Sequence, residues 1–376
     1  MKPNNPFLVT GYHSPEYFCD RRQETETMIQ ALYNGRNVTL IAPRRMGKTG
    51  LVKNVFYKLR EQEPDIVTFY MDIYSTQSLE GFNHIRLFAG TVLGKLDSVP
   101  QKALARVGKF IKSCRPVFTF DELTGQPKVT IDIVPSSEEA TLREIFDYLQ
   151  SSEKRCYIAI DEFQQIAEYP EKGAEALLRS YIQFVPNINF IFAGSKQHIM
   201  QQMFHSAKRP FYQSTQTQVI DRIARDEYYR FAADFFTRQG RKLAEETFGY
   251  LYDAFDGHTW YIQTLLNRLY GYAGNPDIGM VDYAIGEVVA ESTYTYENLL
   301  AAYPASNIRL LKAIAKAGCV REINSGDFIT EYRLRAASSV NSALKRLIDR
   351  EMVYKTADGY IVYDRFMAIW LRQQPF

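Results

Sequence analysis

The stretch that decides the fold spans residues 38–50 and reads Val38-Thr-Leu-Ile-Ala-Pro-Arg-Arg-Met-Gly47-Lys48-Thr49-Gly50. Its β-branched start is typical of a buried strand. Its second half matches the phosphate-loop pattern GxxxxGK followed by Ser or Thr, except at the first position, where Ala42 replaces glycine. Apolar residues then repeat at helical spacing through residue 61. Strand, glycine-containing turn and helix thus follow in the order that a mononucleotide-binding unit requires.

The turn is expected to cradle the phosphates of a nucleotide. Backbone N–H groups converge there on phosphate oxygens, and the dipole of the following helix adds positive potential. Lys48 would neutralise charge on the β- and γ-phosphates, and the Thr49 hydroxyl would ligate Mg²⁺. A tight strand-to-helix turn without a ligand is the alternative interpretation. The expected nucleotide-binding residues are Pro43, Arg44, Arg45, Met46, Gly47, Lys48, Thr49 and Gly50.

Two adjacent carboxylates follow another strand-like run. Asp161 and Glu162 come directly after residues 156–160, which places Asp161 at the carboxyl end of a central strand. There Asp161 can hold Mg²⁺, and Glu162 can deprotonate the attacking water. Ser195 follows a strand-like run at 188–193 and could sense the γ-phosphate or position water. A solvated acidic strand end and a plain strand-ending turn are the respective alternatives. The candidate catalytic residues are therefore Glu162, Lys48 and Ser195, and the candidate metal ligands are Thr49 and Asp161.

Strands and helices alternate through the first part of the chain. Strand-like runs at 66–73, 156–160 and 188–193 alternate with helical segments, one of which runs through about residue 112. Residues 117–133 alternate like an extended β-hairpin and look like an insertion without assigned chemistry. The expected fold class is α/β, a P-loop NTPase parallel sheet with helices on both faces.

Strand signals stop after about residue 222, and the organisation changes. Residues 223–302 are expected to form a helical lid domain, in which His258 is a helix cap or, alternatively, a contact to nucleotide. Residues 303–376 show three helical segments and a hairpin turn at Asp358-Gly359, which is the pattern of a winged helix. With an ATPase core at 1–222, we expect three domains.

The winged-helix segment carries local positive charge. It holds 12 Lys and Arg against 7 Asp and Glu, whereas the whole chain holds 45 and 43 and has a formal net charge of +2. Its helix at about 336–350 is expected to place Val340, Leu344, Leu347 and Ile348 on one face and polar side chains on the other. DNA and a protein are both left open as partners of this module, and so is assembly into a homo-oligomer.

Composition excludes several classes of protein. Hydrophobic residues make up 46% of the chain and charged residues 23%, which argues against intrinsic disorder. The four cysteines form no CxxC pair, which argues against a disulfide framework or a zinc site. No apolar run approaches the ~20 residues that span a bilayer, and the N-terminus lacks the apolar core of a signal peptide. We therefore expect a cytoplasmic protein without a membrane partner.

Together these motifs resemble the archaeal-type ATPase family of P-loop proteins, within the signal-transduction (STAND) branch related to AAA+ ATPases. The combination of Pro-Arg-Arg-x-Gly-Lys-Thr with Asp-Glu-Phe-Gln is more specific than either motif alone. The resemblance implies an ATPase core, a helical lid and a C-terminal winged helix, with ATP turnover used as a conformational switch. It rests on Phe18-x-Asp-Arg21-x-x-Glu24, Pro43-Arg-Arg-Met-Gly-Lys-Thr49, Ile160-Asp-Glu-Phe-Gln164, Phe192-Ala-Gly-Ser195, Gly257-His-Thr-Trp-Tyr261 and Tyr363-Asp-Arg-Phe-Met-Ala-Ile-Trp-Leu371.

The chain departs from the family pattern in two places. The family usually has glycine where this chain has Asp20, and it often has Gly-Arg where this chain has Phe211-Tyr-Gln-Ser214. Lys208 and Arg209 are the candidate substitutes for that arginine, which in related enzymes contacts phosphate and can contribute ~10³–10⁵ in rate. Two functions therefore stay open. One is Mg²⁺-dependent ATP hydrolysis used as a switch, and the other is a nucleotide-gated DNA- or protein-binding regulator with little or no turnover.

Overall fold

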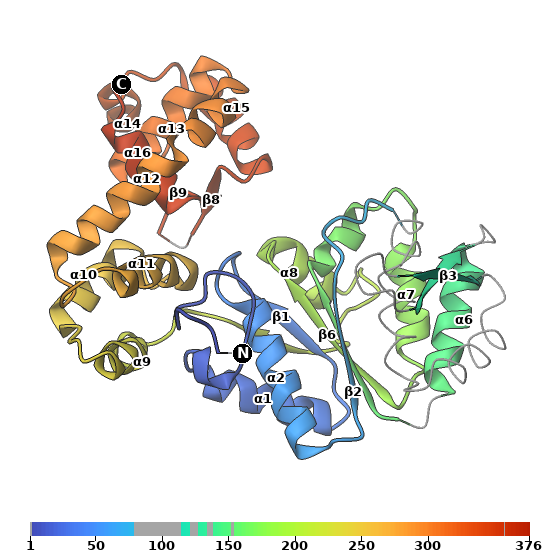
Figure 1. The fold of residues 1–376 in the computed structure, drawn as a ribbon. Coiled ribbons are helices and arrows are strands. Elements are labelled where there is room, and N and C mark those ends of the chain that lie inside the picture. The colour runs from blue at the N-terminus through green and yellow to red at the C-terminus, as the bar shows by residue number, and fades with distance from the viewer. Residues whose placement is uncertain (1, 79–113, 121–126, 134–137, 152–153, 357) are drawn as a thin grey trace. The chain divides into compact units, whose positions relative to one another are not determined.

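The computed structural model describes the chain except for residues 1, 79–113, 121–126, 134–137, 152–153 and 357 (Figure 1). It divides into two compact units. The first contains Leu8–Tyr228 with residues 1–3, and the second contains Tyr229–Phe376 with Asn4–Phe7. The helical segment expected through about residue 112 falls mostly outside the described residues. The domain boundaries expected at residues 222 and 302 stay predictions.

A five-stranded parallel sheet forms the centre of the first unit. The strands pair in the order β2-β5-β6-β1-β7. Strand β6 thus lies between β1 and β5, so that the carboxyl ends of these three strands are neighbours. Their bounds are β1 (Val38–Ile41), β2 (Val67–Asp72), β5 (Cys156–Asp161), β6 (Ile188–Gly194) and β7 (Gln216–Val219).

Helices cover both faces of this sheet, which confirms the predicted fold class. Helices α1 and α2 bury one core with side chains such as Leu40 and Ala159, and α6, α7 and α8 bury another with Ile158 and Phe190. Alternate residues of one strand point to opposite faces, so neighbouring positions enter different cores. The helices of this unit are η1 (Pro15–Tyr17), α1 (Arg22–Tyr33), α2 (Lys48–Gln62), α6 (Glu138–Gln150), η2 (Phe163–Glu168), α7 (Ala174–Ile182) and α8 (Gln197–His205).

Strand β7 has no counterpart among the strands predicted from the sequence. It reads Gln-Thr-Gln-Val and none of its residues is buried, so it lacks the hydrophobic signal that marks the other four strands. The predicted hairpin is confirmed. Its strands β3 (Cys114–Phe120) and β4 (Pro127–Ile133) pair antiparallel in a sheet of their own, and its turn lies outside the described residues.

The second unit is helical and ends in a winged helix. Helices α13, α14 and α15 precede the hairpin β8-β9, and α16 closes the chain (Figure 1). The expected helical run and hairpin are therefore present. The bounds are α9 (Arg225–Arg238), α10 (Glu245–Ala254), α11 (Thr259–Gly271), α12 (Ile278–Ala301), α13 (Ala305–Ala317), α14 (Gly326–Glu331), α15 (Ala337–Asp349), β8 (Val353–Lys355), β9 (Tyr360–Val362) and α16 (Arg365–Gln373).

Helix α15 corrects one expectation. It buries Val340, Ala343, Leu344 and Leu347, whereas Ile348 is 39% exposed. Ile348 stands about 90° around the helix from the centre of this buried stripe, because successive residues advance by about 100°. Its expected place on the buried face is therefore wrong.

A segment from the start of the chain completes the second unit. Phe7 is fully buried, and the Asn5 amide donates to the Asn267 carbonyl while the Asn267 amide donates to the Phe7 carbonyl. The Phe7 ring packs against four other rings, with centroids 5.6 to 6.3 Å away, namely Phe231, Phe235, Phe236 and Tyr270. The chain consequently passes between the two units three times, after Pro3, after Phe7 and after Tyr228.

Candidate nucleotide-binding site

The loop between β1 and α2 contains two residues with left-handed backbone conformations. Arg45 and Gly47 adopt left-handed backbone conformations, with φ of 67° and 89°, and Gly47 caps the N-terminus of α2. Ala42 is not among the residues with positive φ, so this position does not require the glycine of the usual motif. The loop therefore delivers the chain to the start of α2, where the helix dipole favours an anion.

Lys48 lies at the centre of this loop and is 6% exposed. Its Nζ donates to the carbonyl oxygens of Ala42 and Pro43, at 3.3 and 3.5 Å. Burial lowers the pKa of the Lys48 amine, and the nearby carboxylates of Asp161 and Glu162 oppose that shift. A phosphate would be a stronger partner than these carbonyls, because it would bring a full negative charge close to the ammonium.

Thr49 and Asp161 meet beside the loop. The Thr49 hydroxyl donates to Asp161 Oδ2 at 3.0 Å, and the backbone N–H of Glu162 donates to Asp161 Oδ1 at 2.9 Å. These oxygens suit Mg²⁺, which typically binds one or two carboxylates plus substrate phosphates and keeps several waters. The described residues contain no group of three or more His, Cys, Asp or Glu that could hold a metal ion. Thr49 and Asp161 therefore fit an ion that takes its remaining ligands from nucleotide and water.

Glu162 and Ser195 also lie together. The Ser195 hydroxyl donates to Glu162 Oε2 at 2.6 Å, and the Gln164 amide donates to the same oxygen at 2.5 Å. Gln164 is 1% exposed, and its Oε1 accepts the backbone N–H of Ser195 at 3.3 Å. Glu162 itself has a φ of 56°, a left-handed conformation that is strained for a non-glycine residue. The carboxyl ends of β5 and β6 are thus joined by one polar network. Gln164 belongs to this network, although no role was predicted for it from the sequence.

Arg21 is a second residue whose role was not predicted. It is 3% exposed, and its guanidinium donates to the Met46 carbonyl at 3.3 Å and to Glu24 at 2.9 Å. Arg21 thus braces the loop through a backbone carbonyl. The preceding Asp20 has a φ of 47°, a left-handed conformation that glycine adopts more readily than aspartate.

The remaining loop residues have different surroundings. The Met46 side chain is 4% exposed and belongs to the core beside α2, so only its backbone is available to a nucleotide. The Arg44 guanidinium lies over the Tyr74 ring, 5.2 Å from its centroid. A Cβ added to Gly50 would come within 3.0 Å of the Phe18 ring, so Gly50 permits close packing behind the loop.

The candidate substitutes for the family arginine differ from one another. Arg209 forms an ion pair with Glu175, and burial raises the pKa of that carboxyl while Arg209 opposes the rise. Lys208 is exposed, and the Ser214 hydroxyl donates to the Phe211 carbonyl at 2.7 Å. In the second unit, His258 occupies the N-cap position of α11.

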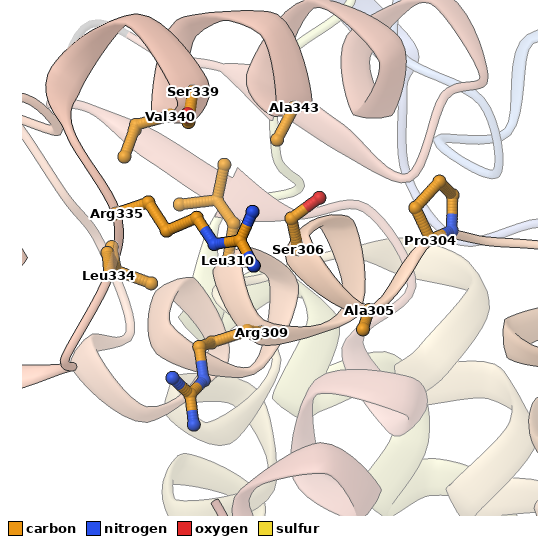
Figure 2. A pocket seen from close by; sticks show the side chains of 10 residues that line it. All are labelled: Pro304, Ala305, Ser306, Arg309, Leu310, Leu334, Arg335, Ser339, Val340 and Ala343. Atoms are coloured by element: carbon orange, nitrogen blue, oxygen red, sulfur yellow. The ribbon is translucent and has the colours of Figure 1, made fainter.

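A cavity of about 430 Å³ lies in the second unit, in the winged helix. Its lining comes from the start of α13, from α15 and from the segment before α15. Figure 2 shows the Arg335 side chain extending across the Leu310 floor toward Ser306, while Val340 and Ala343 point in from α15. The cavity contains none of the phosphate-loop residues, so it is a separate feature.

None of the described helices combines the length and apolarity needed to cross a bilayer.

Comparisons with known proteins match this geometry at the level of fold. Residues 294–373 match the probable winged helix domain family. A search of the curated proteins finds no match. The chain is similar to the Walker-type ATPase of Pyrococcus abyssi, at 17% identity over 98% of this chain and 99% of that chain, with a TM-score of 0.66.

Two proteins of Aeropyrum pernix are also similar. The ORC2 protein, solved as ADPNP and ADP complexes, is 17% identical over 98% of this chain and 96% of that chain, with a TM-score of 0.63. The ORC1 protein in complex with DNA is 12% identical over 99% and 97%, with a TM-score of 0.55. The chain therefore has the fold of Walker-type ATPases with a C-terminal winged helix. At the level of fold, this confirms the resemblance to archaeal-type, AAA+-related ATPases.

Proposed function

We propose that this chain binds Mg²⁺·ATP at residues 42–50 and hydrolyses it slowly, so that its nucleotide state acts as a conformational switch for the winged helix. The observation that carries the proposal is the 3.0 Å hydrogen bond between Thr49 and Asp161, which joins the two candidate metal ligands beside the buried Lys48. The similar ORC2 protein was solved as ADPNP and ADP complexes, which supports nucleotide binding by this chain.

Each residue of the site then has a defined task. Lys48 would exchange its two loop carbonyls for β- and γ-phosphate oxygens, and Thr49 and Asp161 would hold Mg²⁺. Mg²⁺, when bound, neutralises charge that develops on the phosphates. Glu162 would accept a proton from the attacking water once Ser195 turns its hydroxyl to the γ-phosphate. The Ser195–Glu162 hydrogen bond supports this pairing of sensor and base.

Phosphate release and nucleotide binding by three proteins test the proposal. Wild type should bind ATP and release phosphate slowly. Lys48→Ala should lose most nucleotide affinity, whereas Glu162→Gln should bind ATP but release phosphate roughly 10²–10⁴-fold more slowly, as expected for loss of a general base. If all three release phosphate only at background while wild type binds ATP, the chain is not an ATPase.

The second candidate is a nucleotide-gated regulator with little or no turnover. It is favoured by Arg209, which is already paired with Glu175, and by Ser214, which occupies the place of the family arginine. This candidate predicts tight nucleotide binding with phosphate release near background in wild type and in Glu162→Gln.

A partner would bind through the winged helix. The exposed face of α15 carries polar and basic side chains including Ser338, Asn341, Ser342 and Lys345, which suits a nucleic-acid groove. The similar ORC1 protein was solved with DNA, which supports DNA as the first partner to test. In a mobility-shift assay, DNA affinity should fall with salt and differ between ATP and ADP. A DNA affinity that depends on salt but is the same with ATP and with ADP would contradict the switch. If DNA does not bind, a protein partner is the alternative.

The proposal includes the organisation of the chain and its setting. We assign the ATPase core to residues 1–222, the helical lid to 223–302 and the winged helix to 303–376. We also propose a cytoplasmic location and leave self-association to be measured by analytical ultracentrifugation with and without ATP.

A further inference from the structure

Tyr70 makes contact with both candidate metal ligands. Its hydroxyl donates to Asp161 Oδ2 at 2.5 Å and lies 3.2 Å from the Thr49 hydroxyl oxygen, which is itself 3.0 Å from Asp161 Oδ2. The three oxygens thus form a compact triangle. No role was predicted for Tyr70 from the sequence.

The position of Tyr70 follows from the sheet and from α2. Tyr70 on β2 pairs with Ala159 on β5. Ala159 lies two residues before Asp161, so the side chains of Tyr70 and Asp161 lie on the same face of the sheet. Lys53, one helical turn beyond Thr49, has its ammonium 5.4 Å from the centroid of the Tyr70 ring. The phenol is therefore directed to the Thr49–Asp161 pair by neighbours on two elements.

The Tyr70 hydrogen bond limits how a metal ion can reach Asp161. A carboxylate oxygen has two lone pairs, and those of Asp161 Oδ2 are used by Thr49 and by Tyr70. The Thr49 hydroxyl can keep its proton on Asp161 while its own lone pair faces a cation. The Tyr70 bond then occupies the remaining acceptor site on that oxygen. A cation, or a water bound to it, therefore reaches Asp161 Oδ2 only after the Tyr70 bond breaks.

We propose that Tyr70 gates the cation: its phenol satisfies Asp161 in the empty site and has to leave when the metal and nucleotide bind. The inference rests on the proposed nucleotide site and makes Tyr70 a positioning residue that sets how much divalent cation is needed. Removing the phenol should leave Asp161 short of one donor in the empty site, so the bound cation should gain affinity.

The test is a Mn²⁺ titration followed by electron paramagnetic resonance, in the presence of saturating ADP, with wild type and Tyr70→Phe. We expect Tyr70→Phe to bind Mn²⁺ about tenfold more tightly, which corresponds to about 1.4 kcal/mol. ADP affinity without any divalent cation should be unchanged. In thermal melts, Tyr70→Phe should be less stable than wild type without the cation, and the difference should shrink when Mn²⁺ and ADP are present.

Tyr250→Phe is the matched control. Tyr250 donates to Asp282 Oδ1 at 2.7 Å in the second unit, so this variant also loses a tyrosine–carboxylate hydrogen bond but should bind Mn²⁺ like wild type. Unchanged or weaker Mn²⁺ binding by Tyr70→Phe would overturn the gate while leaving nucleotide binding intact. A wild type that binds ADP neither with nor without Mn²⁺ would instead overturn the proposed function.

Discussion

At Gly194 the absence of a side chain shapes the network around Glu162. A Cβ at Gly194 would lie 2.5 Å from Gln164 Oε1 and would also collide with the Met200 side chain. Gly194→Ala should therefore displace the Gln164 amide and disturb Glu162 and Ser195. We expect ATP turnover to fall on the order of 10²-fold, as when catalytic groups are misplaced by about 1 Å. Phosphate release measures the loss, and equilibrium titration should show nearly unchanged ATP affinity.

Gly286→Ala is the control for that variant. It lies inside α12, and an added Cβ there meets nothing within 4 Å. This change should keep wild-type turnover and add up to ~1 kcal/mol to the free energy of unfolding, because alanine favours helix over glycine. Full turnover in Gly194→Ala would show that the amide of Gln164 is not needed to position Glu162.

The Glu175–Arg209 pair predicts a pH dependence at the residue scale. Burial raises the pKa of the folded Glu175 carboxyl above its usual 4.5, although Arg209 opposes the shift. The folded state then binds this proton more tightly than the unfolded state, so acidification through the raised pKa should stabilise wild type relative to Glu175→Gln. Chemical unfolding of both proteins at pH 7.5 and pH 5 measures the difference. A difference that is the same at both pH values would contradict the raised pKa.

Phe7 ties the N-terminal segment to the helices at the scale of elements. Its fully buried ring fills a space between α9 and α11, so Phe7→Ala should cost about 3–5 kcal/mol in the free energy of unfolding of the second unit. Tryptophan fluorescence follows this unfolding. Tyr294→Ala, at a side chain that is 75% exposed, should cost less than about 0.5 kcal/mol. Wild-type stability of Phe7→Ala would mean that the segment merely lies on the surface.

The elements also show how far the sequence could predict the structure. Strand β1, α2 and the carboxylates at the end of β5 each have a signal confined to a short run of consecutive residues, and their placement was predictable. Strand β7 was missed because its polar residues hydrogen-bond at the edge of the sheet without burying side chains. Tyr70 contacts Asp161, 91 positions away, and Gln164 contacts Ser195, 31 positions away, and such contacts depend on strand order. Local periodicity does not determine strand order.

At the scale of the whole molecule, the tryptophans report on the proposed switch. Trp260 on α11 and Trp370 on α16 are the two tryptophans of the chain, and both belong to the second unit. The phosphate loop belongs to the first. If nucleotide state reaches the winged helix, saturating ATP should change tryptophan emission in wild type and not in Lys48→Ala. ATP binding without any change in emission would contradict the coupling.

The repeated passage of the chain between its units has a practical consequence for anyone who expresses part of it. A fragment that starts at residue 225 keeps helices α9 to α16 whole but discards the tetrapeptide Asn4–Phe7. The aromatic rings that pack around Phe7 would be exposed to water, and such a fragment should aggregate and be poorly soluble. Supplying residues 4–7 on a short linker should restore it. The helices of the second unit are thus not expected to fold well as one continuous C-terminal fragment.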